Sequence, residues 1–374
     1  MKRLLMLGGG HAHVHVLQAI AREPLPGAEV MLVTPYSRQM YSGMVPGLVA
    51  GHYSAAACAI PLQPLALAAR LPLVESSAVS IDAAARKVTL ADGRIAEYDV
   101  LSIDTGSVMD RSLIPGAREH GLFVRPIEHF VQLFEGLLDL AAQRVLDIVV
   151  LGGGAAGVEL AMALQYRLGE TGVTLGQERA RIALVTGGAA PLAGYPPRVM
   201  QRAARALRQR RISVLPEVCA AIERGHVLLG NGARLACDAP VLAIGSSAPA
   251  WLAGSGLTLD ERGFIVTRPS LQSTSHAEVF AVGDVASRND VPLPKSGVHA
   301  VRAGPPLAHN LRALLAGGTL VQHRPQTRTL NLLACGERRA IASWGGWSAE
   351  GAWVWRWKNH IDRAFVARYS VTGL

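Results

Sequence analysis

The feature that most constrains this chain is a glycine turn near its start. The apolar run at residues 3–7 stops at three glycines and gives way to an apolar, alanine-containing stretch with helical spacing. This order predicts a strand, a tight turn and a helix N-terminus. Gly8 permits the turn, Gly10 lets the backbone approach a pyrophosphate, and the helix offers unpaired N–H groups and its positive dipole end. His13 stands where the G-x-G-x-x-G pattern normally has glycine or alanine, so this turn alone leaves open some other α/β protein.

A second unit of the same kind lies at residues 147–164, now with the complete pattern at Gly152, Gly154 and Gly157. Ala155 begins the expected helix. Two such units, each after a β-rich apolar run, predict two nucleotide-binding folds in one chain. The expected class is therefore α/β, with two Rossmann-like dinucleotide-binding domains.

Composition agrees with this class. The chain has 374 residues, of which 50% are hydrophobic and 17% charged, and its 39 glycines suit buried parallel sheets with many tight turns. The net charge of +9 is compatible with anionic cofactors or an anionic membrane surface. We expect no nucleic-acid partner, because neither a Lys/Arg run nor an aromatic-basic signature is present. No apolar run is long enough to predict a transmembrane helix, and the expected location is the cytoplasm, including the inner face of its membrane.

The residues at two strand ends leave open how the ribose is bound and which nicotinamide nucleotide is preferred. The strand expected at residues 28–34 ends on Thr34 and Pro35, where dinucleotide folds usually place an acid on the ribose. The strand expected at residues 180–186 likewise ends on Thr186, so a preference for NADH or NADPH cannot be read. The histidines after the first turn suggest a metal site less strongly than a phosphate site, because no carboxylate or cysteine stands near them; they are His11, His13 and His15.

The remaining pattern predicts alternating strands, hairpins and helices. Residues 38–52 are rich in Gly and Pro and predict a loop, either lying against a large ring or simply connecting elements. Hairpins are expected at residues 86–98 and around Asn231-Gly232, and a buried strand at residues 98–107 ends in Thr105-Gly106. Further helices are expected at residues 11–22, 123–143 and 197–211, and further strands at residues 212–215, 263–267 and 278–286.

With the last of these strands, which carries Gly283 and Asp284, the chain resembles the two-dinucleotide-domain flavoprotein superfamily. The resemblance implies that Asp284 binds the ribityl hydroxyls of FAD and that the first glycine turn holds the FAD pyrophosphate. Thr105-Gly106 would make a main-chain contact, and the second glycine turn would hold NAD(P)H. The full set of cofactor contacts that we expect is Gly8, Gly10, His11, Ala12, Thr34, Pro35, Met44, Pro46, Val79, Thr105, Gly106, Gly283 and Asp284, with Gly152, Gly154, Ala155, Gly157 and Thr186 in the second unit.

Within the superfamily the chain looks most similar to the branch of type II NADH dehydrogenases and sulfide:quinone oxidoreductases. The stretches GGGHAHVH and YSGMVPGLVAGHY, with the Trp-rich C-terminus, resemble the flavoprotein module found fused to selenide, water dikinase. This resemblance implies hydride transfer from NAD(P)H to FAD and a quinone or another small molecule as electron acceptor. Glu159 occupies the GVELA position whose Glu lies near the nicotinamide in type II dehydrogenases.

Two departures limit the resemblance. The four cysteines form neither a C-x-x-C pair nor a zinc pattern, so disulfide reductase chemistry is not expected and a sulfide-oxidising mechanism is doubtful. Residues 295–304 replace the quinone-site pattern A-Q-x-A-x-Q, and Lys295 and His299 are candidates to stabilise a reduced flavin or to protonate an acceptor. The alternatives are a flavoprotein that partners or senses in selenium metabolism with slow turnover, and a sulfide:quinone oxidoreductase-like enzyme.

The C-terminal residues 352–369 predict an amphipathic helix. Val354, Trp357, Ile361 and Phe365 fall on one arc, and the charged residues fall opposite. Such a helix either attaches reversibly to a membrane or docks on the flavin domain as core. We expect an FAD-binding domain at residues 1–115 and 260–318, an NAD(P)H-binding domain at 116–259, and a C-terminal region at 319–374 that contacts a membrane or a second copy in a homodimer.

Overall fold

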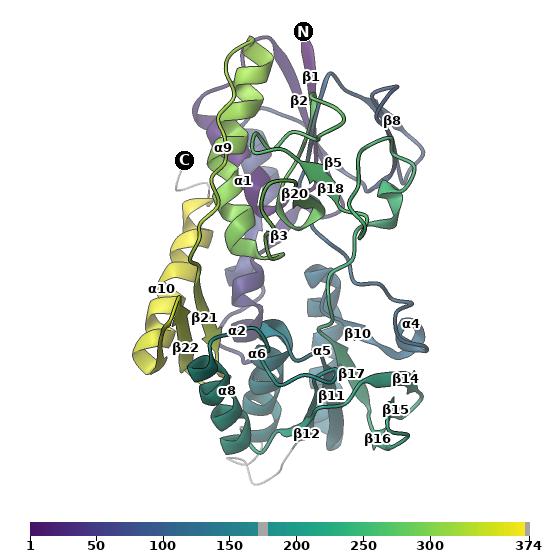
Figure 1. Cartoon of the computed structure of the whole chain (residues 1–374), viewed down its shortest axis with the longest axis vertical. Helices are drawn as coiled ribbons and strands as arrows, with labels where there is room; N and C mark the ends of the chain where they lie inside the picture. Colours follow the sequence, from purple (N-terminus) through teal and green to yellow (C-terminus); the bar gives the residue numbers. More distant parts are fainter. Residues whose placement is uncertain (171–178, 371–374) are drawn as a thin grey trace.

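Two parallel sheets, one above the other along the long axis, organise the molecule (Figure 1). The computed structural model describes residues 1–170 and 179–370. A C-terminal hairpin sheet and helix lie along one side, next to helices of both halves. The prediction of an α/β fold with two Rossmann-like domains is confirmed, while the domain boundaries stay a prediction.

The first sheet has the strand order β19-β9-β1-β2-β5, and all its pairs are parallel. Its apolar strands are buried because helix α1 (His11–Arg22) packs on one face together with α9 (Gly297–Ala316). The strands are β1 (Lys2–Leu7), β2 (Ala28–Thr34), β5 (Leu73–Glu75), β9 (Val100–Ile103) and β19 (Val279–Ala281). Strand β19 comes from far along the chain but pairs with β9 in this sheet. The segment after β19 therefore returns to the first glycine turn.

The second sheet repeats this layout in the order β10-β17-β11-β12-β13, again with parallel pairs. Its strands are β10 (Leu122–Phe123), β11 (Leu146–Leu151), β12 (Ala180–Val185), β13 (Ser213–Leu215) and β17 (Ala239–Leu242). The helices of this half are α4 (Ala117–His120), α5 (Ile127–Gln143), α6 (Ala155–Leu164), η3 (Gln165–Glu170) and α8 (Pro197–Gln209).

Small antiparallel sheets extend the two halves. Their strands are β6 (Ala78–Asp82), β7 (Lys87–Leu90) and β8 (Ile95–Glu97) in the first half, and β14 (Cys219–Glu223), β15 (His226–Leu229) and β16 (Arg234–Ala236) in the second. The C-terminal unit consists of β21 (Leu330–Ala334), β22 (Ala340–Trp344), β23 (Trp347–Gly351) and α10 (Ala352–Arg368). The remaining short elements are β3 (Arg38–Met40), η1 (Ser42–Met44), α2 (Val45–Val49), η2 (Ala56–Cys58), β4 (Ala59–Pro61), α3 (Leu62–Ala68), η4 (Ala250–Leu252), β18 (Ile265–Thr267), η5 (Gly283–Val285) and β20 (Ala286–Arg288).

The predicted helix at residues 11–22, the strand at 28–34 and both hairpins are confirmed. Three predictions differ from the structure. The strand expected at residues 278–286 is shorter: β19 ends at Ala281, and Gly283 and Asp284 lie in the turn η5 before β20. The helix expected to start at residue 123 starts at Ile127, because Phe123 belongs to β10 and Pro126 takes the extended conformation just before the helix. Residues 38–52 are not one irregular loop: they contain β3, η1 and α2, and Met44 and Pro46 are buried in the core.

Helix α10 is present as predicted, and its apolar arc is divided between the protein and solvent. Its buried side is formed by Val354, Lys358, Asp362 and Tyr369, while Trp357 and Ile361 are exposed. The hydropathy pattern is misleading here because Lys358 Nζ donates to Asp362 Oδ2 (2.7 Å) and to the Gly43 carbonyl (2.7 Å), which makes a buried charged pair tolerable. The apolar arc therefore faces outward in part.

Candidate functional site

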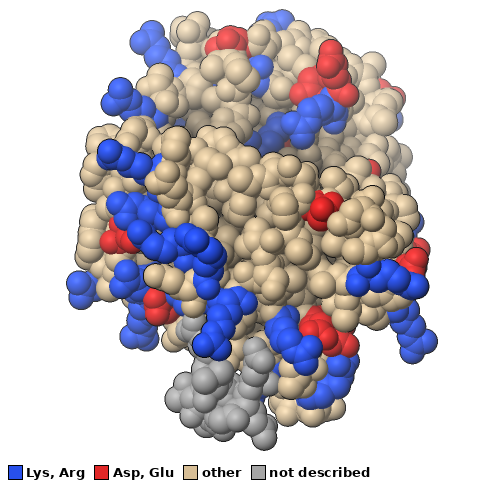
Figure 2. All heavy atoms as spheres, turned by 60° about the horizontal axis from the view of Figure 1, so that its bottom comes forward, with Lys and Arg blue, Asp and Glu red and all other residues tan. Residues whose placement is uncertain are grey.

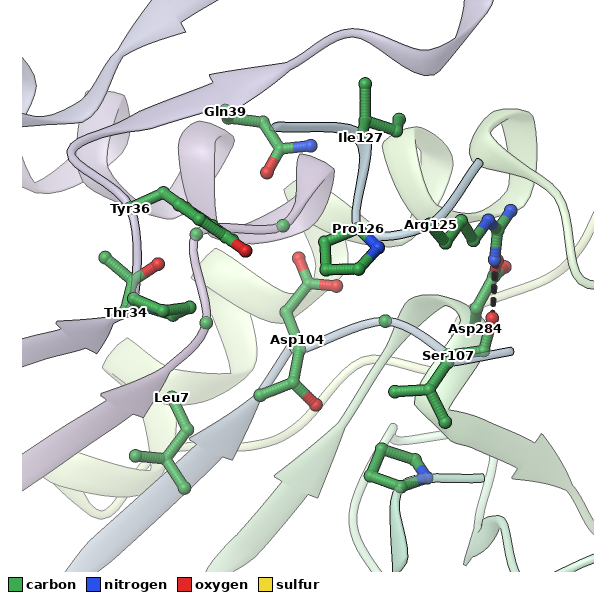
Figure 3. A pocket seen from close by; sticks show the side chains of 18 of the residues that line it. Leu7, Thr34, Tyr36, Gln39, Asp104, Ser107, Arg125, Pro126, Ile127 and Asp284 are labelled. Atoms are coloured by element: carbon green, nitrogen blue, oxygen red, sulfur yellow. Dashed lines mark hydrogen bonds and ion pairs between the residues drawn. The ribbon is translucent and has the colours of Figure 1, made fainter. Parts of the chain in front are cut away.

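A cavity of about 390 Å³ lies at the carboxyl ends of β1, β2 and β9, where a parallel sheet places its ligand site. Figure 3 shows the side chains that line it. The cavity brings together residues from both halves of the chain: the first glycine turn, the ends of β2 and β9, residues 125–128 before and within α5, and Asp284. Of the predicted contacts, it is lined by Gly8, Gly10, His11, Thr34, Pro35, Thr105, Gly106 and Asp284.

The glycine turn is shaped by a residue that the sequence analysis missed, Asp104. Gly8 has a φ of +87°, and a Cβ there would lie 2.5 Å from the Asp104 carbonyl oxygen. A Cβ at Gly10 would lie 2.3 Å from Cγ of the Asp104 side chain. Gly10 is thus needed because a carboxylate approaches it, a role that we did not predict. The signal was present in the sequence, since Asp104 directly precedes Thr105-Gly106 at the end of the buried strand β9.

Asp104 also forms the first hydrogen bonds of helix α1. Its Oδ2 accepts the backbone N–H groups of Ala12 (2.8 Å) and His13 (3.0 Å). The side chain is almost fully enclosed, because the residue is 3% exposed. Burial raises the pKa of this carboxyl to about 7, although the two N–H donors act in the opposite direction.

Asp284 lies at the other end of the cavity, where it meets a cation from the second half of the chain (Figure 3). Arg125 Nη1 donates to Asp284 Oδ2 (2.9 Å) and to Ser107 Oγ (2.5 Å). Arg125 and Ser107 were not predicted as site residues, because nothing in a single sequence pairs them with Asp284. The arrangement places a hydrogen-bonded carboxylate where the flavin sugar is expected.

The histidines of α1 are not arranged as metal ligands. One is buried and hydrogen-bonded within the protein, and another lines the cavity. His13 is fully buried, with Nδ1 at 2.6 Å from the Gly8 carbonyl and Nε2 at 2.7 Å from Ser102 Oγ. His11 lines the cavity, and among the described residues its buried Nε2 has no hydrogen-bond partner. Burial lowers the pKa of both rings to about 4, so they are neutral near pH 7. Within residues 1–170 and 179–370, no cluster of three His, Cys, Asp or Glu side chains is arranged to hold a metal ion.

Several predicted cofactor contacts lie beside the cavity and do not line it. Val79 is exposed, because alternation along β6 directs its neighbour Ala78 to the cavity. Met44 and Pro46 pack into the core below. Ala12 faces the core, and its backbone N–H donates to the Asp104 carboxyl. Gly283 packs closely against the same carboxyl, because a Cβ at this position would lie 2.8 Å from Asp104 Oδ1.

Lys295 and His299 flank the site without lining the cavity. Lys295 Nζ donates to the Ala286 carbonyl (2.5 Å) and lies 3.7 Å from the centre of the Phe264 ring. Burial lowers the pKa of Lys295 to about 8 and also lowers the pKa of His299, against the attraction of Asp284. Their predicted roles toward a flavin or an acceptor stay predictions.

The second glycine turn is more open than the first. Gly154 is exposed, and a Cβ there would meet nothing within 4 Å. Gly152 has a φ of +126° and lies against the Ala243 carbonyl, and Gly157 lets α6 approach the Gly152 carbonyl. Ala155 is the first residue of α6, and Thr186 Oγ1 donates to the Ala189 carbonyl (2.5 Å) at the end of β12. The second turn is therefore less enclosed by protein than the first.

Glu159 projects from α6 toward the C-terminal unit. Its Oε1 accepts the N–H of Ala334 in β21 (2.6 Å). Burial raises the pKa of Glu159 to about 7, while the charge of Lys358 opposes that rise. The structure places this carboxyl at a junction of α6, β21 and α10; its predicted contact with the nicotinamide stays a prediction.

The four cysteines are free thiols that do not form a pair: Cys58, Cys237 and Cys335 are buried and Cys219 is half-buried. Burial raises the pKa of each, to about 12 for the three buried thiols and about 11 for Cys219. Such thiols are poor nucleophiles at neutral pH.

The fold and the two glycine turns are those of a two-dinucleotide-domain oxidoreductase. The family model described as "Pyridine nucleotide-disulphide oxidoreductase" matches residues 2–310. The chain belongs to that family.

Related proteins and structures extend over most of the chain. It is 26% identical over 357 residues to the demethylphylloquinone reductase NdbB of Synechocystis sp., covering 91% of this chain and 86% of that protein. It is 23% identical to the type II NADH:quinone oxidoreductase of Staphylococcus haemolyticus, covering 84% and 83%. Two solved structures share the fold with TM-scores of 0.81. These are the sulfide:quinone oxidoreductase of Aquifex aeolicus (18% identity, 99% and 91% covered) and NDH2 of Plasmodium falciparum in complex with NADH (12% identity, 100% and 99% covered).

Proposed function

We propose that this protein is an FAD-dependent NAD(P)H dehydrogenase that passes electrons to a quinone. The observation that carries the proposal is the pair of unlike glycine turns in one chain of this family: in the first, closed turn Gly8 and Gly9 are buried beside the cavity, and in the second, open turn Gly154 is exposed. A resident cofactor suits the closed turn and a co-substrate suits the open one.

The residues of the closed cavity fit FAD. The glycine turn and the N-terminus of α1 suit a diphosphate, the unpartnered Nε2 of His11 awaits a polar partner, and Asp284 suits sugar hydroxyls. Bound FAD would supply an acceptor for hydride and a carrier of electrons. The protein holds Asp284 in position through Arg125 and Ser107.

NAD(P)H belongs at the open turn. Gly154 leaves room for its pyrophosphate at the N-terminus of α6, and the same helix carries Glu159, whose Oε1 accepts the Ala334 N–H of the C-terminal unit. No acid–base residue is needed for hydride transfer itself, so the contribution of these residues is to orient the dinucleotide.

The quinone acceptor is supported by the relatives named above, whose names describe quinone reduction. The alternatives are weaker. A sulfide-oxidising mechanism would use paired cysteines by the flavin, and the described thiols are unpaired with raised pKa values. A slow flavoprotein partner in selenium metabolism rests only on the resemblance of three stretches of sequence.

We further propose that the protein reaches its lipid-soluble acceptor by resting on an anionic membrane. No helix within the described part of the chain combines the length and apolarity needed to cross a bilayer. Instead, five exposed apolar side chains from β22, β23 and α10 form what we name the tryptophan face: Trp344, Trp347, Trp353, Trp357 and Ile361. The rings of Trp353 and Trp357 stack at 6.4 Å, and Trp347 lies 6.5 Å from Trp353.

Basic side chains accompany this face. Helix α8 packs against β22 and β23, and its Arg198, Arg205 and Arg208 are exposed, as is Arg356 on α10. The space-filling view shows Lys and Arg gathered along one side of the molecule, with fewer acidic residues among them (Figure 2). Indole rings suit the headgroup level of a bilayer, and each nearby cation adds about 1 kcal/mol at an anionic leaflet.

The enzymatic proposal is tested by anaerobic steady-state assays of NADH and NADPH oxidation with a series of quinones. We expect oxidation of at least one reduced nicotinamide that depends on added quinone and on bound FAD. A chain that keeps FAD yet oxidises neither nicotinamide with any quinone would favour the slow partner instead.

A further inference from the structure

Asp104 lies at the N-terminal end of α1, where the proposed function places a phosphate group of FAD. Its carboxyl accepts the N–H groups of Ala12 and His13, which belong to the first turn of that helix. Figure 3 shows the side chain among the residues that line the cavity. Gly10 and Gly283 enclose it on two sides, because a Cβ at either position would lie within 2.8 Å of a carboxyl oxygen.

A carboxylate and a diphosphate at one buried helix end are two anions that compete for the same positive potential. In such a place the charged forms repel each other strongly, since little water screens them. Removing the charge of one partner relieves this repulsion. A diphosphate stays ionised at neutral pH, so the carboxyl is the group that can become neutral.

The charged and titratable groups around Asp104 do not offset its charge. His11 and His13 on α1 are neutral near pH 7 because burial lowers the pKa of each to about 4, and burial also lowers the pKa of His299 on α9. Asp284 in η5 adds a like charge. Arg125, which comes just before α5, donates its hydrogen bonds to Asp284 and Ser107. The pKa of Asp104 is therefore raised to about 7, chiefly by burial.

We propose that Asp104 couples flavin affinity to pH: its carboxyl carries a proton while the FAD diphosphate is bound at the first glycine turn, and it ionises when the flavin leaves. The proton comes from solvent, one O–H bond forms on the carboxyl, and no electrons are transferred. The acid form also adds one O–H donor to the cavity. This inference rests on the proposed function, because it requires FAD at this turn.

The expected signature is a slope in the pH dependence of the dissociation constant. Below the pKa of Asp104 in the flavin-free chain, the dissociation constant of FAD should be constant. Above it, each unit of pH should raise the constant about tenfold, because the competent protonated form becomes rarer in proportion.

The test uses the flavin-loaded full chain, diluted in buffers from about pH 6 to about pH 9, with free FAD measured after ultrafiltration. For the wild type we expect an increase in the dissociation constant of about 50-fold between pH 7 and pH 9, because the carboxyl is already about half ionised at pH 7. Asp104→Asn and Asp104→Ala each remove the titrating group, so either should show a change of less than about threefold. Asp139→Asn, an exposed carboxyl on α5, makes the same chemical change away from the cavity and should follow the wild type.

Each outcome of this experiment either supports the inference or overturns it. A flat wild-type profile, or a slope retained in a folded Asp104 variant, overturns the inference and leaves the proposed function intact. Loss of FAD by the wild type at every pH contradicts the proposed function itself. If neither variant folds, a second measurement tests the inference: proton uptake when FAD is added to the flavin-depleted full chain in weak buffer near pH 8. We expect uptake of about one proton per FAD, and no uptake would overturn the inference.

Discussion

Single residues at the closed cavity carry the flavin assignment, and Asp284 is the first to test. We expect Asp284→Ala to lose most of its FAD, because it removes a charge-assisted hydrogen bond to the sugar and leaves Arg125 without its carboxylate. Loss of such a bond costs about 1.5–3 kcal/mol, or about one to two decades in the dissociation constant. Flavin content after gel filtration measures this, with Asp139→Ala as the control. Full retention by Asp284→Ala would contradict the assignment of the ribityl site.

Glu159 is the residue to test at the open turn. Burial raises its pKa to about 7, so the carboxylate form, which accepts hydrogen bonds, is lost as pH falls through 7. If it positions the nicotinamide, the apparent affinity for NAD(P)H should rise with pH through this range, and Glu159→Gln should flatten the profile. Stopped-flow flavin reduction at several nicotinamide concentrations measures it. An unchanged profile in Glu159→Gln would assign the side chain to its structural bond with Ala334 alone.

At the scale of elements, α10 is held by its buried Lys358–Asp362 pair. Asp362→Ala leaves the buried Lys358 ammonium without its carboxylate and with only the Gly43 carbonyl as acceptor, which should lower the free energy of unfolding by about 3–5 kcal/mol. Arg363→Ala removes the exposed contact with Asn359 on the same helix and should cost less than about 1 kcal/mol. Denaturant unfolding of both chains compares them. Equal stability would mean that the pair does not anchor the helix.

The tryptophan face gives the second element-scale prediction. Trp353→Ser combined with Trp357→Ser should reduce binding of the full chain to phosphatidylglycerol vesicles and leave its fold unchanged, because both rings are exposed. Leu67→Ser combined with Leu133→Ser, which replaces exposed apolar residues on α3 and α5, serves as the control. Co-sedimentation measures binding. If wild type and tryptophan variant bind equally, or if the folded wild type binds neither anionic nor neutral vesicles, this face is not a membrane contact.

The sequence patterns predicted the elements well where local signals and burial agree. The strands, glycine turns and hairpins were read correctly because Gly8, Gly152 and the Asn231-Gly232 turn require conformations that few other residues adopt. The sequence left open whether helix α10 contacts a membrane or docks on the protein, because hydropathy cannot foresee that Lys358 and Asp362 form a buried pair and leave part of the apolar arc exposed. Asp104 and Arg125 were missed because their roles depend on partners that lie distant in sequence, at α1 and at Asp284.

At the scale of the whole molecule, the two halves differ in how they expose their glycine turns, and this difference gives the account its central claim. The first turn is closed by Asp104 and by residues 125–128 from the second half, while Gly154 of the second turn remains exposed. We propose from this asymmetry that the flavin resides at the first turn, that the nicotinamide exchanges at the second, and that electrons pass from the second to the first.

The most direct test is an anaerobic titration of the purified, flavin-containing chain with NADH and, separately, with NADPH, followed by the visible absorbance of the flavin. The account predicts that about one equivalent of at least one of the two bleaches one bound FAD within the mixing time of a manual titration, and that a later addition of quinone restores the colour. Tightly bound FAD that neither nucleotide reduces, even in excess, would contradict it.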